Sequence, residues 1–452
     1  MIIKQFEDKN LSHYSYAVID GNEMVIIDPS RNPHPYYDFA DENNVVIKAV
    51  IETHPHADFV SSHLEIHQVT NARIYSSKLI GAKYPQQPFD EGQSFTLGKL
   101  KLTAWNTPGH SPDSITIILE NEKGKDIAAF TGDTLFIGDC GRPDLREKAG
   151  NIHQKREELA RRMFHSLKRF HSLNDEVIIY PAHGSGSFCG RNLSTESSNT
   201  IGKERKYNWC LQPMQEREFV KALLEGQPFI PKYFGYDVDM NVKGAPAYFE
   251  SIGKVSIGGS LKNNKESHFL NREILIVDTR TPAKFKAFSL DNSINIPEDL
   301  QFETWLGTII APYEKFYLVA ENLFLLKQII SRTAKIGYES FIVSAYVLHD
   351  EIHIAPSFDL TDFSLHPDDY TIVDVRTEAE AAAGSFTNSL HIPLHSLRNN
   401  IKSIPENKPI VVHCASGYRS AIGSSIIRRS LKNNHTKVHD LGEAIKSFDL
   451  SD

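Results

Sequence analysis

An internal repeat in the second half of the chain constrains the fold more than any other feature of the sequence. The stretch ILIVDTRTPAKF at residues 274–285 resembles YTIVDVRTEAEA at residues 370–381, and Asp278 and Asp374 within them lie 96 positions apart. Each copy begins with a short apolar run, offers a second apolar run later, and has helical patterns between the two. This alternation is typical of an α/β unit with a parallel sheet. The repeat therefore predicts two copies of one α/β domain.

The first half of the chain alternates short β-rich runs with loops. Residues 14–28 indicate two strands around a turn, and Leu159, Met163, Leu167 and Phe170 recur at the spacing of an amphipathic helix. Further strands are predicted at residues 45–52, 99–105, 114–120, 126–132 and 176–184. The glycine- and lysine-rich stretch at 256–268 is interpreted as a linker or a loop before a new domain.

Composition excludes several classes of partner. The chain has 452 residues, 40% of them hydrophobic, and a net charge of −8, which favours neither nucleic acid nor an anionic membrane as a partner. No apolar run is long enough to span a bilayer, and the first residues lack the pattern of a signal peptide. The four cysteines fit no disulfide framework and no Cys-x-x-Cys zinc site, so a cytoplasmic location is expected.

Four apolar runs in the first half each end in a loop that carries residues of the kinds that bind metals. Strand ends at one edge of a sheet can converge, so these side chains are expected to surround an ion. A single histidine near a strand end is usually an ordinary polar residue, but four such loops in this order favour a metal site. The residues are His54, His56 and Asp58 in THPHAD, His110 in TPGH, Asp133 in TGD, and His183 in PAHG.

The order of these motifs resembles the metallo-β-lactamase superfamily over roughly residues 1–240. The resemblance implies an αββα sandwich with one metal held by His54, His56, His110 and Asp133. A second metal would take Asp58, Asp133, His183 and the residue at position 59. Position 59 is Phe59, which cannot ligate a metal, so a hydrolytic two-metal arrangement is disfavoured.

Within the superfamily, the sequence resembles the persulfide dioxygenases most closely. That resemblance implies one Fe(II) per chain, held by His54, His110 and Asp133, with open positions for O2. His56, Asp58 and His183 would then form a supporting or vestigial site. Zinc is the alternative metal. The motif DCGRPD at 139–144 is similar to one in which an arginine, here Arg142, binds an anionic substrate, although a structural arginine in a turn is an equal alternative.

The sequence departs from the glutathione-type members of that family after His183, where Gly184 and Ser185 stand in place of Asp and Tyr. This departure puts the identity of the carrier thiol in doubt. Cys189 resembles a cysteine of the rhodanese-fused members and is a candidate substrate-binding or sulfur-accepting residue. The alternative is a small buried side chain.

A second constellation lies at residues 410–429, IVVHCASGYRSAIGSSIIRR. Cys414 follows a predicted strand, Gly417 permits a tight turn, and Arg419 leads into a predicted helix. Inward-pointing backbone N–H groups, the helix N-terminus and Arg419 would stabilise a thiolate and hold an anion such as sulfite. The pattern resembles the active loop of rhodanese sulfurtransferases, which implies that Cys414 is the nucleophile, with Gly417 and Arg419 in catalytic roles.

The first repeat carries no comparable cysteine. With an offset of 93 between the second strands, Glu321 is expected opposite Cys414, Phe324 opposite Gly417 and Leu326 opposite Arg419. The first repeat is therefore interpreted as a rhodanese fold without the chemistry. The predicted domains are a metallo-β-lactamase-like dioxygenase at 1–250, a degenerate rhodanese-like domain at 251–355 and an active rhodanese domain at 356–452, the last two with parallel sheets.

The whole chain resembles a persulfide dioxygenase–rhodanese fusion. The resemblance implies oxidation of a low-molecular-weight persulfide by O2 to sulfite and free thiol, coupled to sulfur transfer through Cys414 to give thiosulfate in sulfide detoxification. The expected partners are the persulfide, O2 and sulfite, and a homo-oligomer, a dimer or tetramer, is expected. One alternative is a zinc hydrolase of glyoxalase II type with an appended sulfurtransferase. Another is a non-catalytic sulfur relay that uses only Cys414.

Overall fold

The structure is a computed structural model that describes residues 1–145, 156–349, 358–431 and 435–450. Two compact units divide the chain, the first containing residues 1–252 and 334–337 and the second containing residues 253–333 and 338–452. The predicted domain boundary at 355/356 lies outside the described residues. Among the helices of the described ranges, none is both long and apolar enough to cross a membrane.

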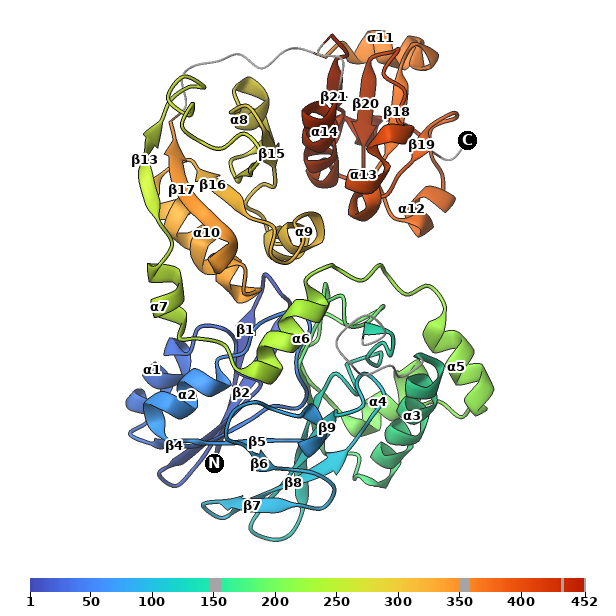
Figure 1. Ribbon diagram of the computed structural model, residues 1–452. Helices are drawn as coiled ribbons and strands as arrows, with labels where there is room; N and C mark the ends of the chain where they lie inside the picture. The colour runs from blue at the N-terminus through green and yellow to red at the C-terminus, as the bar shows by residue number, and fades with distance from the viewer. Residues whose placement is uncertain (146–155, 350–357, 432–434, 451–452) are drawn as a thin grey trace. The chain divides into compact units, whose positions relative to one another are not determined.

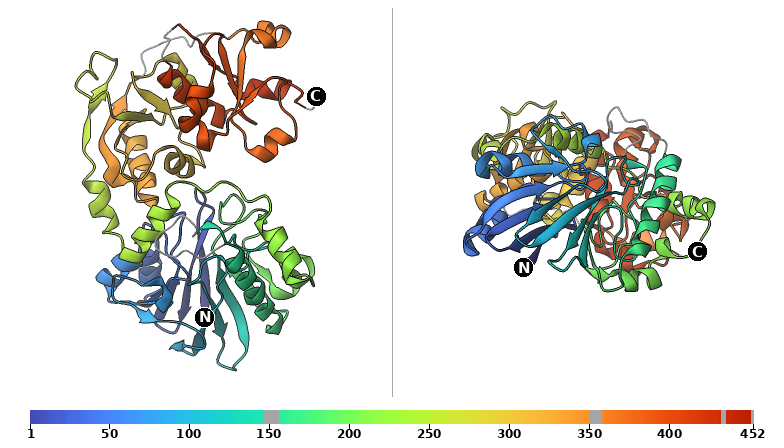
Figure 2. Two further views of the ribbon diagram at one scale, coloured as in Figure 1. Left: turned by 45° about the vertical axis from the view of Figure 1, so that its right-hand side comes forward. Right: turned by 90° about the horizontal axis from the view of Figure 1, so that it is seen from below.

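Two six-stranded sheets form the centre of the first unit, and helices cover their outer faces (Figures 1 and 2). The first sheet has the order β1 (Ile2–Asp8), β2 (His13–Asp20), β3 (Glu23–Ile27), β4 (Val46–Ile51), β5 (Arg73–Ser76) and β6 (Gln87–Pro88). The second has the order β12 (Asn199–Thr200), β11 (Ile178–Pro181), β10 (Asp126–Gly132), β9 (Ile115–Glu120), β8 (Leu100–Asn106) and β7 (Ser94–Leu97).

Apolar side chains from both sheets interdigitate between them, and separate clusters join each sheet to its helices. On the first sheet lie α1 (His34–Glu42) and α2 (His63–Thr70), and on the second lie α3 (Arg156–Arg169) and α5 (Glu216–Leu224). The remaining helices are α4 (Ile201–Tyr207), α6 (Phe234–Lys243) and α7 (Tyr248–Gly253). Strands β2, β3, β4 and β8–β11 and helix α3 confirm the predicted elements, and the layers confirm the expected αββα sandwich.

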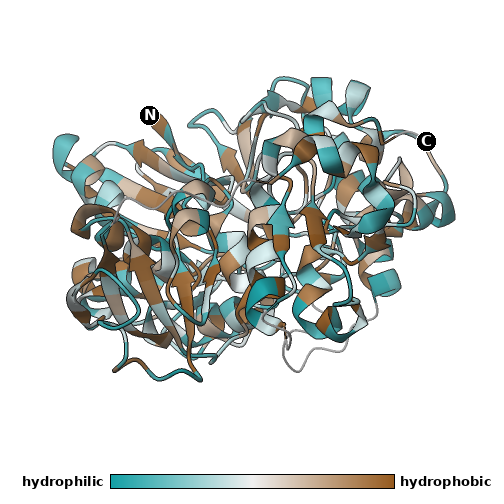
Figure 3. Cartoon of the chain, turned by 90° about the horizontal axis from the view of Figure 1, so that it is seen from above, coloured by the Kyte–Doolittle hydropathy of each residue, from teal (hydrophilic) through white to brown (hydrophobic). Residues whose placement is uncertain are grey.

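The second unit contains two separate parallel sheets, as the repeat predicts. The first has the order β13 (Ile257–Leu261), β17 (Ile342–Leu348), β16 (Phe316–Ala320), β14 (Leu275–Asp278) and β15 (Ser293–Asn295). The second has the order β19 (Leu390–His391), β18 (Thr371–Asp374), β20 (Ile410–His413) and β21 (Val438–Asp440). Strands β14, β16, β18 and β20 are buried along their whole length, as strands covered on both faces of a parallel sheet must be. Figure 3 shows hydrophobic residues, in brown, along strands in the interior of the molecule.

Helices accompany both of these sheets. The first copy has α8 (Pro282–Ala287), α9 (Phe302–Ile309) and α10 (Leu323–Lys335). The second has α11 (Leu360–Leu365), α12 (Glu378–Ala382), α13 (Leu394–Asn400) and α14 (Tyr418–Ser430). In Figure 1, α14 lies beside β20 and β21.

The prediction of a linker or loop at 256–268 was wrong for residues 257–261 and is confirmed for residues 262–268, which contain no helix or strand. Residues Ile257–Leu261 form β13, which pairs in parallel with β17 at the edge of the first parallel sheet. The segment has two glycines and mostly exposed side chains, so it lacks the apolar pattern of a buried strand. Backbone pairing with β17 forms the strand where side-chain burial does not.

Candidate metal centre and cysteine loop

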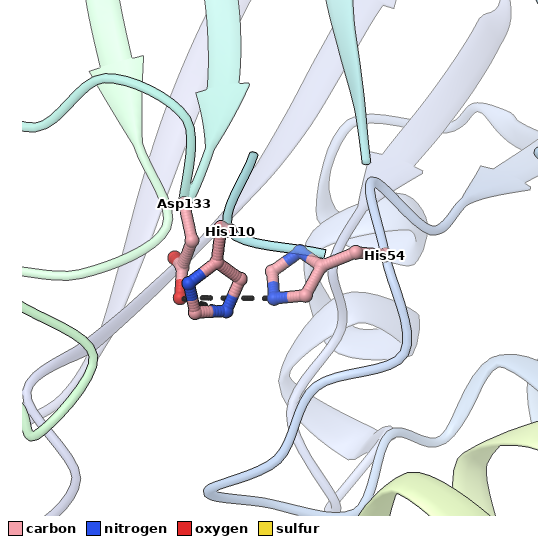
Figure 4. A group of neighbouring side chains, drawn as sticks. All are labelled: His54, His110 and Asp133. Carbon is pink, nitrogen blue, oxygen red and sulfur yellow. Dashed lines mark ion pairs between the residues drawn. The ribbon is translucent and has the colours of Figure 1, made fainter. Parts of the chain in front are cut away.

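The predicted metal-type residues of the first unit lie together at one edge of its sheets. The loop after β4 carries His54, the loop after β8 carries His110, and Asp133 directly follows β10. Figure 4 shows these three side chains pointing toward one another. Oδ2 of Asp133 lies 3.6 Å from Nε2 of His54 and 3.5 Å from Nε2 of His110. All three side chains are buried, so two imidazoles and one carboxylate face a common point in the interior.

A second group of candidate ligands adjoins the first. His56, Asp58 and His183 each offer one ligand atom, and these atoms lie within 4.8 Å of one another. His183 joins the two groups, because its Nε2 lies 2.8 Å from Oδ2 of Asp58 and its Nδ1 lies 2.8 Å from Oδ1 of Asp133. The structure therefore brings together all six residues that the sequence assigned to a metal site, in two adjoining sets of three.

The donor atoms of the first set fit a metal ion. Nε2 of His54 and Oδ2 of Asp133 are buried and make no hydrogen bond within the described parts of the chain. A buried polar atom without a hydrogen bond costs about 1–3 kcal/mol, a cost that coordination of a cation removes. His54, His110 and Asp133 are thus suited to hold an ion.

Electrostatics in the pocket favour ligation. Burial opposes ionisation of Asp133, but the imidazoles of His183, His54 and His110 outweigh it and hold the pKa of Asp133 well below its usual value. Burial lowers the pKa of His54 well below its usual value, and the nearby His56 adds to this effect. An ionised carboxylate and a neutral imidazole are the forms that bind metals. The pKa of His183, in the second set, moves in the opposite direction. Burial opposes its protonation, but Asp133 and Asp58 outweigh burial and raise the pKa well above the usual value.

Phe59 lies against the second set and is completely buried. Its ring centroid is 4.4 Å from that of His56 and 6.5 Å from that of His183. On its other side lies His13, with the ring centroids 3.9 Å apart. An apolar ring therefore stands beside the second set, at the position where the superfamily pattern has a ligand.

His13 is a residue of this site that the sequence analysis did not assign. It is buried, and its backbone forms an isolated antiparallel bridge with His183. Burial lowers its pKa well below the usual value, so it is a neutral member of the pocket wall. No motif spacing links residue 13 to the other loops, and only the pairing of distant segments brings it here.

Two further residues hold the loop that carries His54 and His56. Asp28 accepts hydrogen bonds from the Thr53 backbone N–H at 2.7 Å and from the Thr53 hydroxyl at 2.8 Å. Asn241, on α6, donates from Nδ2 to the carbonyl oxygens of His56 and Phe59, at 2.8 Å each. Asn241 lies more than 180 positions from the loop, and Asp28 lies 25 positions from Thr53, so the sequence gives no local signal for these contacts.

Arg142 is engaged within the protein. Its side chain is 1% exposed, and its Nε and Nη2 donate to the Asp144 carboxylate at 2.7 and 2.6 Å. Nη2 also donates to the carbonyl of Pro228 at 2.6 Å, and Nη1 to that of Phe188 at 3.3 Å. These contacts support the structural alternative for Arg142, and substrate binding by this residue stays a prediction.

Cys189 is buried beside the metal-type residues. Its Sγ, an oxygen of Asp133 and a nitrogen of His183 lie within 4.8 Å of one another. Burial raises the pKa of Cys189 well above its usual value, and the carboxylates of Asp58 and Asp133 act in the same direction. The thiol is therefore protonated in this environment, and a role in accepting sulfur stays a prediction.

The loop of Cys414 connects β20 to α14 in the second unit. The buried Sγ of Cys414 accepts a hydrogen bond from the backbone N–H of Gly417 at 3.1 Å, and the hydroxyl of Ser420 lies 3.6 Å away. Gly417 has φ of +102°, and a Cβ there would lie 3.0 Å from the carbonyl carbon of Gly442. The turn that directs the N–H at the sulfur therefore requires glycine.

Arg419 has a carboxylate partner that the sequence analysis missed. Its Nη1 and Nη2 donate to the two carboxylate oxygens of Glu380 at 2.7 and 2.6 Å. Burial opposes ionisation of Glu380, but the bonds from Arg419 and Thr377 outweigh it and lower the pKa of Glu380 to about 2. Glu380 therefore remains ionised and fixes the guanidinium of Arg419.

The two parallel sheets of the second unit have matching registers. Asp278 of β14 pairs with Val319 of β16, and Asp374 of β18 pairs with His413 of β20. Because Asp278 and Asp374 are equivalent in the repeat, Val319 is equivalent to His413. The offset between the second strands is therefore 94 positions, rather than the 93 of the sequence alignment.

This register corrects the expected partner of Cys414. Ala320, not Glu321, stands at the equivalent position, and Leu323 and Leu325 are the counterparts of Gly417 and Arg419. The sequence alignment was displaced by one residue because it was anchored on a lysine before the strand. The first copy still has no thiol at this position.

Comparison with known proteins agrees with this architecture. Residues 9–183 match the metallo-beta-lactamase superfamily, and residues 360–450 match the rhodanese-like domain. A hydroxyacylglutathione hydrolase from Tolumonas auensis is 28% identical over 238 residues, 51% of this chain and 80% of that protein. Another, from Neisseria meningitidis, is 30% identical over 178 residues, which cover 38% of this chain and only 62% of that relative.

A solved structure covers more of the chain. A metallo-beta-lactamase from Staphylococcus aureus is 30% identical, has a TM-score of 0.67, and aligns with 77% of this chain and 99% of its own. The fold and the edge-of-sheet donor set define a protein of the metal-binding αββα class. The chain belongs to the metallo-beta-lactamase superfamily and carries a C-terminal rhodanese-like domain.

Proposed function

We propose that the chain is a persulfide dioxygenase joined to a sulfurtransferase. A low-molecular-weight persulfide, R–S–SH, reacts with O2 and water at a mononuclear Fe(II) centre to give sulfite and the thiol R–SH. The observation that carries this proposal is the donor set of His54, His110 and Asp133, whose ligand atoms lie within 4.8 Å of one another. Two imidazoles and one carboxylate are typical of non-haem Fe(II) oxygenases.

The side chains around this set would prepare it for the reaction. Burial keeps His54 neutral, and the imidazoles keep Asp133 ionised, so both are ready to ligate. Phe59 places an apolar ring beside the second donor set, which disfavours a second ion there. When bound, an Fe(II) ion would supply the one-electron chemistry that reaction with O2 requires.

The C-terminal domain would handle the sulfane sulfur. The Cys414 thiolate attacks the outer sulfur of a second persulfide, which forms a Cys414 persulfide and releases R–SH. Sulfite then attacks the outer sulfur of that persulfide, so that thiosulfate leaves and the thiolate returns. The N–H of Gly417 at 3.1 Å from Sγ would stabilise the thiolate in both steps.

Metal analysis and oxygen uptake test the first half of the proposal. Protein purified without oxygen is expected to contain one iron per chain and to consume O2 when a persulfide is added. In the variant Cys414→Ser, where sulfite is not converted to thiosulfate, sulfite and free thiol should appear in equal amounts. Iron-loaded protein that consumes no O2 with any persulfide would refute the dioxygenase assignment.

The variant Cys414→Ser tests the second half. It is expected to stop the formation of thiosulfate while oxygen uptake and sulfite release continue. The unchanged oxygen uptake serves as the internal control for intact folding of the first unit. Thiosulfate formation at the wild-type rate would show that Cys414 is not the carrier.

One alternative function has a specific observation in its favour. The second donor set, His56, Asp58 and His183, resembles half of a two-metal site, and two of the related proteins are hydroxyacylglutathione hydrolases. A zinc-dependent thioester hydrolase with an appended sulfurtransferase would account for both. Two zinc ions per chain, together with hydrolysis of a glutathione thioester, would favour this alternative over the dioxygenase.

The proposal extends to the assembly of the protein. Because the first repeat lacks the cysteine, it is a candidate interface for a dimer or tetramer. Light scattering of the full chain measures the mass directly, and a monomer at micromolar concentration would refute this part.

A further inference from the structure

Two cysteines of the first unit lie together in its interior and have no part in the proposed reaction. Cys140 is in the loop after β10, and Cys210 is in the 3-10 helix η4 (Trp209–Leu211). Both are buried free thiols of one core cluster, and each thiol affects the pKa of the other. We infer that Cys140 and Cys210 are a redox-active pair that sulfane sulfur converts to a disulfide, with consequences for the adjacent metal centre.

Asn208 links the two segments that carry the cysteines. Its Nδ2 donates to the carbonyl oxygens of Phe136 and Asp139, at 3.1 Å each, in the loop of Cys140. Its Oδ1 accepts from the Cys210 thiol at 2.8 Å and from the Cys210 backbone N–H at 3.1 Å. One buried amide therefore binds both segments, and the two thiols are brought together without a covalent bond.

Cys210 borders a cavity in the described part of the first unit. A cavity of about 740 Å³ is lined by Cys210, Met214, Lys168 and His171, among others. Cys210 is 5% exposed, whereas Cys140 is 1% exposed and does not line this cavity. The ammonium group of Lys168 in the cavity wall would attract an anionic persulfide or polysulfide. Cys210 is therefore the thiol that a small sulfur compound reaches first.

The reaction follows from ordinary thiol–disulfide chemistry. The Cys210 thiolate attacks the outer sulfur of R–S–SH, so that a Cys210 persulfide forms and R–SH leaves. The Cys140 thiolate then attacks Sγ of Cys210 and expels the outer sulfur as hydrosulfide. The two thiols lose two electrons in total, and the sulfane sulfur gains them. A thiol such as R–SH reverses the process by exchange.

Burial sets the pace of this reaction. Desolvation raises the pKa of Cys140, and it raises the pKa of Cys210 well above its usual value. Because the thiolate is the reacting form, the pair responds slowly to a single encounter. The response is therefore suited to a sustained excess of persulfide and not to each turnover.

The position of the pair connects it to the metal centre. Gly141 follows Cys140 directly, and a Cβ at Gly141 would overlap the carbonyl oxygen of Asp133 and lie 3.0 Å from Nδ1 of His110. The backbone beside Cys140 is thus packed closely against the main chain of Asp133 and lies near the ring of His110. Drawing Cys140 toward Cys210 would shift this backbone, so we expect the disulfide to reduce oxygen uptake.

The test uses the full chain and inorganic tetrasulfide without O2, so that no dioxygenase turnover consumes the reagent. After alkylation under denaturing conditions, peptide mass spectrometry is expected to find Cys140 and Cys210 joined and protected together. Cys210→Ala should abolish the cross-link and leave Cys140 alkylated. Cys414→Ser, in the other unit, is the matched control and should form the cross-link as the wild type does.

Each result has a defined meaning. Two fully alkylated cysteines, or a persulfide that stays on Cys210 without a cross-link, would overturn the inference. The choice of a compound with sulfane sulfur as the reagent rests on the proposed function. The cysteine pair and the dioxygenase can nevertheless be refuted separately. A cross-link in a protein that never consumes O2 refutes only the dioxygenase, whereas normal oxygen uptake without a cross-link refutes only the pair. Treated wild-type protein should lose oxygen uptake several-fold and regain it with dithiothreitol, and Cys210→Ala should be insensitive.

Discussion

Replacing Glu380 by Gln tests how the loop of Cys414 is held. The substitution keeps the shape of the side chain and removes the charge that pairs with both Nη atoms of Arg419. The lowering of the Glu380 pKa from 4.5 to about 2 sets an upper limit of about 3 kcal/mol on the stabilisation. Because this side chain is 36% exposed, solvent screening reduces the expected loss to about 1 kcal/mol.

The pH dependence of this loss has a defined sign. Glu380 binds a proton more weakly in the folded than in the unfolded chain, so its contribution is fully present above about pH 4.5. The contribution disappears as the pH falls toward about 2. The difference in free energy of unfolding between the wild type and Glu380→Gln should therefore shrink on acidification.

The buried thiol of Cys414 provides the assay, because it becomes accessible when the C-terminal domain unfolds. Urea titrations pulsed with dithiodipyridine, which also reacts in acid, give the unfolding midpoint of that domain when peptide mass spectrometry measures the labelling of Cys414 separately from that of the other three buried cysteines. Glu378→Gln is the matched control, since Glu378 is on the same helix and exposed. An unchanged midpoint for Glu380→Gln at neutral pH, or a difference that grows on acidification, would refute the reasoning.

Four further substitutions test the two sites. Asp133→Ala should abolish iron binding, measured by metal analysis, because it removes the anionic donor; full metal content would contradict its assignment. Phe59→His should raise the metal content above one ion per chain, and an unchanged content would show that position 59 does not control the second site. Asn241→Ala removes three hydrogen bonds of 2.8 Å to residues 56–61 and should destabilise the first unit by about 2–3 kcal/mol in urea titrations. Gly417→Ala, at φ of +102°, should destabilise the C-terminal domain by about 1–3 kcal/mol; a smaller effect would show that the turn tolerates a side chain.

The sequence predicts the fold well wherever the signal is local. Strands β4, β8 and β10 have clear apolar runs, and a polar residue directly after each run marks the sheet edge. Because strand ends share an edge, the sequence alone predicts that His54 and Asp133 lie close together. The repeated aspartates at 278 and 374 likewise predict two parallel sheets, and the structure contains both.

Features that depend on distant segments were beyond the sequence. Asn241 and His13 lie near opposite ends of the sequence of the first unit, yet both contact the metal loop. No spacing rule connects them to His56. Glu380 lies in the repeat motif and forms a capping box with Thr377, but its pairing with Arg419 appears only when α12 is placed beside α14. Strand β13 is missed because its glycines and exposed side chains hide the backbone pairing that forms it.

The equivalence of Ala320 and Cys414 gives the chain an inbuilt comparison. The two parallel sheets have matching registers and belong to one polypeptide. At the end of the second strand, one has the thiol of Cys414 and the other has the methyl group of Ala320. The first copy therefore has the same scaffold but lacks the cysteine, the glycine of the turn and the arginine. Transplanting the six residues from Cys414 to Arg419 onto the end of β16 would reveal whether that short peptide suffices to create a reactive thiol.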